Sequence, residues 1–234
     1  MATNKKDVLR YLDENKDARG IEYWKKHPES SGGLMSYGIG VTRLRKYART
    51  LGRDAKLAAQ LWETDFYEAR IVSLLIDDPK SMTKARAEAQ VEQLAGGYLA
   101  HVFSSCDATL SKTPFVVELM EKWVRSRDAM RRCCGHGLLY EISKSRKKSA
   151  PDNETFLRHI KRIEKTYSKH PMPVLLSMGT ALMGMGMRNR KLHEAALQVA
   201  RKIGPIDFDP NGPRNPMDVE QKLTCDFVSK KLGF

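Results

Sequence analysis

Several features are scarce in this sequence, and their absence excludes whole classes of chemistry. Its 234 residues include four cysteines, with no Cys-x-x-Cys pair and no Cys/His cluster at the spacing of a zinc site. The signatures GxxxxGK(S/T), GxGxxG, HExxH and GxSxG are also missing. The sequence therefore predicts no metal site, no cofactor, and neither nucleotide-binding nor serine-hydrolase chemistry.

Long hydrophobic runs are absent as well. The longest uncharged stretch, residues 170–187, has 18 residues but includes two prolines and three glycines. It is too short and too interrupted for a transmembrane helix, so we interpret it as a buried helix. Residues 1–10 contain no apolar run after their charges, and we expect no signal peptide. These observations predict a cytoplasmic protein with free thiols and no membrane contact.

Positive charge is what the sequence has in excess. Lys and Arg number 41 against 28 Asp and Glu, which gives a formal charge of +13. Residues 121–170 alone hold 14 basic and 6 acidic side chains. The basic residues that stand out there are Arg125, Arg127, Arg131, Arg132, Lys144, Arg146, Lys147 and Lys148. Two interpretations remain open: a solvated loop and helix face, or a groove that follows a phosphate backbone.

The spacing of turn signals and apolar residues predicts helices throughout. Helix breakers recur at intervals that mostly suit one helix plus a turn: Pro79, Gly96-Gly97, Pro114, Pro151, Pro171 and Gly204-Pro205. Between them, apolar residues follow the helical spacing i, i+3, i+4, i+7, as at Leu99, Val102, Phe103 and Cys106. No stretch alternates with the period of a strand.

The expected fold is therefore all-α. A pair of helices would occupy about 36 residues, which is near the period of two-helix solenoid repeats. We predict one domain over residues 1–234, built as an α-solenoid of antiparallel helix pairs. A loop at 205–216 should precede a last helix near 218–232.

One group of residues could carry chemistry. Asp107 lies at the end of a helix expected over 97–108, one turn after Phe103, so both side chains should point the same way. A stripe at i, i+4, i+8 on the next helix but one consists of Arg132, His136 and Tyr140. A carboxylate could stabilise positive charge on a sugar, a ring could contact a base, and an arginine could hold a phosphate. The alternative is a structural ion pair between Asp107 and an arginine.

Several segments, in their order and spacing, carry a family resemblance over roughly residues 35–200. They are Gly38-Ile39-Gly40-Val41, Leu44-Arg45, the run LWETDFYEAR over 61–70, Phe103-Ser104-Ser105-Cys106-Asp107, Trp123-Val124-Arg125-Ser126 and Arg132-Cys133-Cys134. Together they resemble the bacterial DNA alkylation repair family of HEAT-like proteins, the AlkD-type 3-methyladenine/7-methylguanine DNA glycosylases. The resemblance implies a solenoid of HEAT-like helix pairs.

The resemblance also implies roles for particular residues. Asp107 falls on the family's catalytic carboxylate and Arg132 on its active-site arginine. A positively charged concave surface would grip duplex DNA, and a cationic N3- or N7-alkylated purine would leave without a base-shaped pocket. Phe103 and Thr180 stand where the family has two tryptophans, which weakens the stacking and cation–π contact expected with a cationic lesion.

Two functions follow from the sequence. The leading hypothesis is a monomeric alkylation-repair N-glycosylase on duplex DNA with alkylated bases, with Asp107 as the catalytic residue and neither metal nor cofactor. Its expected DNA- or lesion-binding residues are Phe103, Arg131, Arg132, His136, Tyr140, Lys144 and Thr180. The alternative is a non-catalytic helical-repeat module that binds DNA or structured nucleic acid. A protein–protein scaffold is a third hypothesis, which the basic stretch disfavours.

Overall fold

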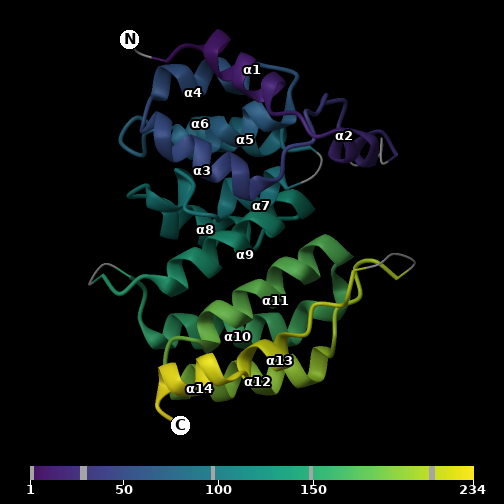
Figure 1. The fold of residues 1–234 in the computed structure, drawn as a ribbon. Helices are drawn as coiled ribbons and strands as arrows, with labels where there is room; N and C mark the ends of the chain where they lie inside the picture. Colours follow the sequence, from purple (N-terminus) through teal and green to yellow (C-terminus); the bar gives the residue numbers. More distant parts are fainter. Residues whose placement is uncertain (1–2, 27–30, 96–97, 148–149, 211–213) are drawn as a thin grey trace. The chain divides into compact units, whose positions relative to one another are not determined.

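The computed structural model describes residues 3–26, 31–95, 98–147, 150–210 and 214–234, and within these ranges the regular elements are helices (Figure 1). The α-helices are α1 (Lys5–Glu14), α2 (Ala18–Lys25), α3 (Val41–Leu51), α4 (Ala55–Trp62), α5 (Tyr67–Ile76), α6 (Lys84–Glu92), α7 (Leu99–Ser104), α8 (Val116–Trp123), α9 (Ala129–Lys144), α10 (Asn153–Thr166), α11 (Met172–Gly186), α12 (Arg190–Ile203), α13 (Val219–Leu223) and α14 (Asp226–Leu232). Two 3-10 helices are η2 (Leu110–Lys112) and η3 (Tyr167–Lys169). β-Pairing in the described ranges is limited to two isolated bridges. The all-α prediction is confirmed.

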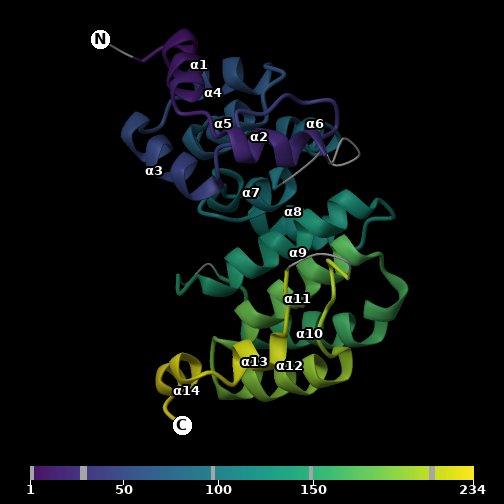
Figure 2. The same ribbon diagram turned by 45° about the vertical axis from the view of Figure 1, so that its right-hand side comes forward.

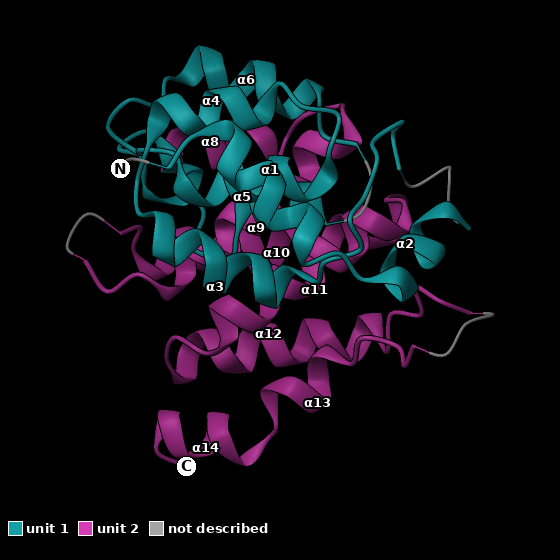
Figure 3. Cartoon of the chain, turned by 45° about the horizontal axis from the view of Figure 1, so that its top comes forward, with its two compact units in different colours: residues 1–116 teal, residues 117–234 magenta. Residues whose placement is uncertain are grey.

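The chain divides into two compact units, residues 1–116 and residues 117–234 (Figure 3). Each unit has its own buried apolar core. The single continuous domain over 1–234 stays a prediction from the sequence. No helix of the described ranges is long and apolar enough to cross a membrane.

Helix α5 is the centre of the first unit. Eight of its ten residues are buried, and it packs against α1, α3, α4 and α7 (Figure 1). A helix that is buried almost all round belongs in a core rather than at a surface. The buried side chains of α5 therefore form the surface on which α1, α3, α4 and α7 pack.

A buried carboxylate on α5 ties down the chain that leads into α3. Glu68 is fully buried, and its Oε1 accepts hydrogen bonds from the Ser36 hydroxyl (2.7 Å) and the Ile39 amide (3.1 Å). Its Oε2 accepts from the Tyr37 amide at 3.0 Å. Such charge-assisted bonds satisfy both carboxylate oxygens in the core. This contact joins two of the segments that carry the family resemblance.

In the second unit, α9 and α11 lie side by side, and α11 also packs against α10, α12 and α13 (Figures 1 and 2). Two glycines allow close approaches within this unit: Gly184 of α11 faces α9, and Gly135 of α9 faces the end of α8. A Cβ on Gly135 would lie 2.6 Å from the backbone nitrogen of Val124, and a Cβ on Gly184 would overlap the hydroxyl of Ser143. The helix backbones can therefore approach where a larger residue would hold them apart.

The C-terminal segment differs from its prediction. The single helix expected near 218–232 is two short helices, α13 and α14. Both the amide and the hydroxyl of Thr224 donate to the carbonyl of Glu220, at 2.9 and 3.0 Å, which ends α13. Three features named from the sequence lie outside the described residues: Gly96-Gly97, Lys148 and residues 211–213 of the predicted loop.

Candidate nucleic-acid interface

The segment that carries Asp107 is not helical, so the predicted helix over 97–108 is wrong at its C-terminal end. Helix α7 ends at Ser104. The hydroxyls of Ser104 and Ser105 donate to the carbonyls four residues earlier, at 2.8 and 2.5 Å. Serine hydroxyls in such positions compete with the backbone for helix carbonyls, and here they close the last turn.

The two residues that follow adopt a strained backbone. Cys106 and Asp107 have φ values of 60° and 61°, and no other described non-glycine residue has a positive φ. The next turn is anchored to the end of α5, because the Thr109 amide donates to the Leu74 carbonyl at 3.2 Å and its hydroxyl to the Asp77 carbonyl at 2.6 Å. Strain of this kind persists where neighbouring bonds hold the backbone in place.

This turn separates the side chains of Phe103 and Asp107. Phe103 is 1% exposed and belongs to the core of the first unit, whereas the Asp107 side chain is 65% exposed. The prediction that they point the same way is therefore wrong. The Phe103 ring packs in the core, and the carboxylate faces solvent.

Asp107 lines a surface hollow of about 240 Å³ in the first unit. We call it the Asp107 hollow. Its basic side chains come from α3, from the turn after α3 and from η2: Arg45, Arg49, Arg53 and Lys112. Its other lining residues are Ala48, Gly52, Leu75 and Cys106. Four cations around one carboxylate give the hollow an excess of positive charge that suits phosphate oxygens.

Three of these cations are held by polar contacts: Arg45 and Lys112 by Asp107, and Arg53 by the end of α5 and Thr109. The Arg45 Nη2 lies 3.3 Å from Asp107 Oδ2, and Lys112 Nζ donates to the Asp107 carbonyl at 2.5 Å. The Arg53 guanidinium donates from Nη1 to the Leu75 and Asp77 carbonyls (2.8 Å each) and to the Thr109 hydroxyl (2.9 Å). An exposed ion pair such as Arg45–Asp107 adds little stability. Its effect is to orient the carboxylate.

These basic residues are not among the site residues predicted from the sequence. Arg45 and Arg49 are four residues apart on α3, which is the available sequence signal for a shared helix face. Nothing in the sequence places that face beside Asp107, which lies 62 positions after Arg45. The contact is set by the packing of the first unit.

The predicted stripe on α9 belongs largely to the interior of the second unit. His136 is 2% exposed, and its Nδ1 lies 2.8 Å from the Arg132 carbonyl. Burial lowers the pKa of His136 to about 4, so the ring is neutral at pH 7. The Arg132 Nη1 donates to the carbonyls of Ser126 and Arg127, at 2.9 and 2.7 Å. Arg132 therefore holds the loop between α8 and α9.

The other predicted binding residues also have partners inside the second unit. Arg131 lies 4.0 Å from Asp128, and the Thr180 hydroxyl donates to the Leu176 carbonyl at 3.0 Å. The remaining two interact with each other, because the amino group of Lys144 lies 4.7 Å above the ring of Tyr140. Lys144 also pairs with Glu141 at 2.6 Å. Asp107 lies in the other unit, and its relation to these residues stays a prediction.

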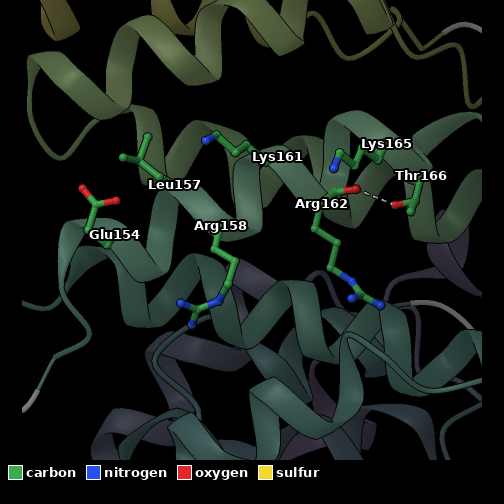
Figure 4. Close-up of a pocket in the computed structure, with 7 residues that line it drawn as sticks. All are labelled: Glu154, Leu157, Arg158, Lys161, Arg162, Lys165 and Thr166. Atoms are coloured by element: carbon green, nitrogen blue, oxygen red, sulfur yellow. Dashed lines mark hydrogen bonds between the residues drawn. The ribbon is translucent and has the colours of Figure 1, made fainter.

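A basic surface that was not predicted from the sequence runs along α10 (Figure 4). The basic face of α10 consists of Arg158, Lys161, Arg162 and Lys165, spaced i, i+3, i+4, i+7. All four are exposed, and together with Glu154, Leu157 and Thr166 they line a shallow hollow of about 590 Å³. The opposite side of α10 is buried through Phe156, His159, Ile160 and Ile163. These charges belong to the basic excess of residues 121–170, and their helical spacing is the sequence signal for a common face.

The electrostatic effect of this face reaches a neighbouring histidine. The pKa of His170 is lowered first by burial and then by the charges of Arg132 and Arg162. Two arginines from α9 and α10 therefore act on the same imidazole, and both favour its neutral form. This part of the second unit is electropositive.

Among the described residues, no group of three or more His, Cys, Asp or Glu side chains could hold a metal ion. Fold and surfaces together define an all-α helical protein with basic surfaces on both units. The family sequence model described as "DNA alkylation repair enzyme" matches residues 6–206. The chain belongs to this family, as its sequence segments predict.

The fold has a counterpart among solved structures. The chain is similar to a structure described as "A new family of proteins related to the HEAT-like repeat DNA glycosylases with affinity for branched DNA structures". The TM-score is 0.82 at 19% sequence identity, over 99% of this chain and 97% of the other. The predicted HEAT-like fold is confirmed. No curated protein matches the chain.

Proposed function

We propose that this protein binds DNA and excises cationic alkylated purines from it, with Asp107 as the catalytic carboxylate. The observation that carries the proposal is the Asp107 hollow, in which four cations surround one exposed carboxylate. The cations complement phosphate oxygens, and the carboxylate is open to a nucleotide held beside them. Family membership supports the same class of substrate.

Excision of a cationic purine needs few catalytic groups from the protein. An N3- or N7-alkylated purine carries a positive charge and leaves as a neutral base when the glycosidic bond breaks. Positive charge then develops on the deoxyribose, and a carboxylate placed beside the sugar would stabilise it and orient the attacking water. Arg45, at 3.3 Å, holds the Asp107 carboxylate in position for this role. No enclosed base pocket is needed because the lesion supplies its own leaving-group activation.

Binding should depend on the cations of the hollow. Replacing Arg45 and Arg49 with Gln should weaken binding to duplex DNA and reduce the slope of log K against log salt by about 2, since two phosphate contacts are lost. Fluorescence anisotropy over a salt series measures this slope. The matched control replaces two exposed lysines of α14, Lys230 and Lys231, with Gln. Equal slopes for both variants would remove the hollow from the DNA interface.

A second candidate function is binding to branched DNA without excision. Two observations favour it: the Phe103 ring is buried, and Thr180 stands at the second position where tryptophan was expected, so neither supplies an exposed aromatic face. The basic face of α10 is a second cationic surface of the protein, besides the Asp107 hollow. A DNA junction offers more than one duplex arm, and hence more than one backbone, to such surfaces.

The basic face of α10 provides a test of this second function. Replacing Lys161, Arg162 and Lys165 with Gln should reduce the salt slope for a four-way junction by about 3 and leave that for a linear duplex unchanged. The control variant replaces Lys222, Lys230 and Lys231, which are also exposed. An equal loss on both DNAs would assign α10 to ordinary duplex binding. No loss on either would make it a solvated surface.

A further inference from the structure

A cysteine and a histidine that the proposed function leaves unused are in contact at the Asp107 hollow. The Sγ of Cys106, which lines the hollow, lies 3.2 Å from Nε2 of His101 at the end of α7. Among the other cysteines, Cys134 is buried and Cys133 half-buried. Cys225 is exposed, and its Sγ contacts the Lys222 carbonyl rather than an imidazole. Cys106 is therefore a thiol at the hollow with a base beside it.

The hydrogen bonds of Ser105 favour one tautomer of this histidine, which we assign from the contacts of its hydroxyl. The Ser105 hydroxyl has one hydrogen, and its shortest contact, 2.5 Å, is with the His101 carbonyl, which can only accept. Nδ1 of His101 lies 3.2 Å from the same hydroxyl oxygen, so we assign this nitrogen as the donor. In the neutral ring, Nε2 is then unprotonated and faces the thiol of Cys106. His101 is placed to take the proton of Cys106.

The surroundings favour the ion pair that this transfer creates. Arg45, Arg49, Arg53 and Lys112 line the hollow that holds the thiol, and they stabilise a thiolate. The neighbouring charge that opposes a thiolate is Asp107, which is paired with Arg45. His101 lies in the last turn of α7, where the helix carbonyls favour a positive imidazolium. A thiolate on a tight left-handed turn is a nucleophile held at the surface.

We infer that Cys106 is an alkyl-acceptor site for alkylated phosphates of the DNA backbone. The inference rests on the proposed function, because the cations of the hollow must hold DNA for a phosphate to reach the thiol. They favour a phosphotriester as the donor, since its dealkylation creates a phosphodiester anion beside four cations. The site is distinct in its chemistry from excision at Asp107, which breaks a bond to a base.

The reaction balances without a further reactant. The Cys106 thiol gives its proton to Nε2 of His101, and the thiolate attacks the carbon of the alkyl group on the phosphotriester. An S–C bond forms, the C–O bond breaks, and its electron pair remains on the phosphate oxygen. His101 then releases its proton to solvent. The thioether on Cys106 is stable, so each chain accepts one alkyl group.

The first test measures thiol reactivity in the intact protein. Iodoacetamide is added at a series of pH values, and peptide mass spectrometry follows Cys106 with the exposed Cys225 as internal control. Near pH 6.5 we expect Cys106 to react about tenfold faster than Cys225, and His101→Gln to remove this advantage. Charges that shape the profile are His101, Asp107 and the four cations of the hollow. Equal reactivity of the two thiols in the unaltered protein would overturn the inference.

The second test measures transfer itself. A duplex oligonucleotide with one methyl phosphotriester is incubated with the protein, and the methyl group should appear on Cys106 and disappear from the DNA. Cys106→Ser should abolish this transfer, whereas Cys225→Ser should not. Binding without transfer would overturn the inference and leave the proposed function standing. Absence of DNA binding would overturn both.

Discussion

Asp107→Asn should reduce the single-turnover release of 7-methylguanine from duplex DNA on the order of 100-fold or more, and leave DNA binding nearly unchanged. In the proposed mechanism the carboxylate stabilises positive charge that develops on the sugar in the transition state. Loss of such a group typically lowers the rate on the order of 100-fold or more. The amide is nearly isosteric, so the hollow should keep its shape. Removing one negative charge beside phosphates should, if anything, tighten binding slightly.

The control for this experiment is Asp65→Asn, an exposed aspartate of the same unit that lies outside the hollow. It should release the base at the rate of the unaltered protein. Equal release by the unaltered and Asp107→Asn proteins would remove Asp107 from the chemistry. Strong DNA binding without release by the unaltered protein would favour the branched-DNA function.

Glu68→Ala should lower the free energy of unfolding by about 3 to 5 kcal/mol, because it leaves three donors without their acceptor. These are the Ser36 hydroxyl and the amides of Tyr37 and Ile39, all bonded to the fully buried carboxylate. Glu68→Gln should also destabilise the fold, since its amide nitrogen would face another N–H. The urea midpoint, followed by tryptophan fluorescence, measures both effects.

An exposed glutamate on another helix provides the comparison. Glu194→Ala on α12 should change stability by no more than about 0.5 kcal/mol, as is usual for a surface substitution. A similar midpoint shift for Glu68→Ala and Glu194→Ala would show that the network around Glu68 contributes little.

The fold could be predicted because its signals are local and repeated. Apolar residues at helical spacing and regular breakers define an all-α chain whatever the tertiary contacts. The end of α7 is different, because Cys106 and Asp107 take a left-handed conformation that sequence usually marks with glycine. The Ser104 and Ser105 hydroxyls that end the helix would fit equally well on a longer one. A motif was enough to predict Asp107 as a site residue. The direction in which its side chain points could not be predicted from the sequence.

The stripe on α9 shows a second limit of sequence patterns. Spacing by four places Arg132 and His136 on one helix face, which is correct, but it does not say whether that face is covered. Helix α9 is buried on most of its circumference, because Gly135 and Gly184 let neighbouring segments approach closely. The binding residues expected there are therefore engaged within their own unit. The basic face of α10 was readable from the sequence once its apolar face was recognised.

The exposure of the Asp107 carboxylate has a consequence for what such a site can select. The Asp107 side chain is 65% exposed and lies in a surface hollow, so the site does not enclose a base. The size of the alkyl substituent therefore should not decide which damaged base is excised. Discrimination would then come from the lesion, through the lability of its glycosidic bond. Under the proposed chemistry, bases should be released in the order of their spontaneous depurination rates. The protein would accelerate the loss of bases that are already unstable, and would not select one damaged base by its shape.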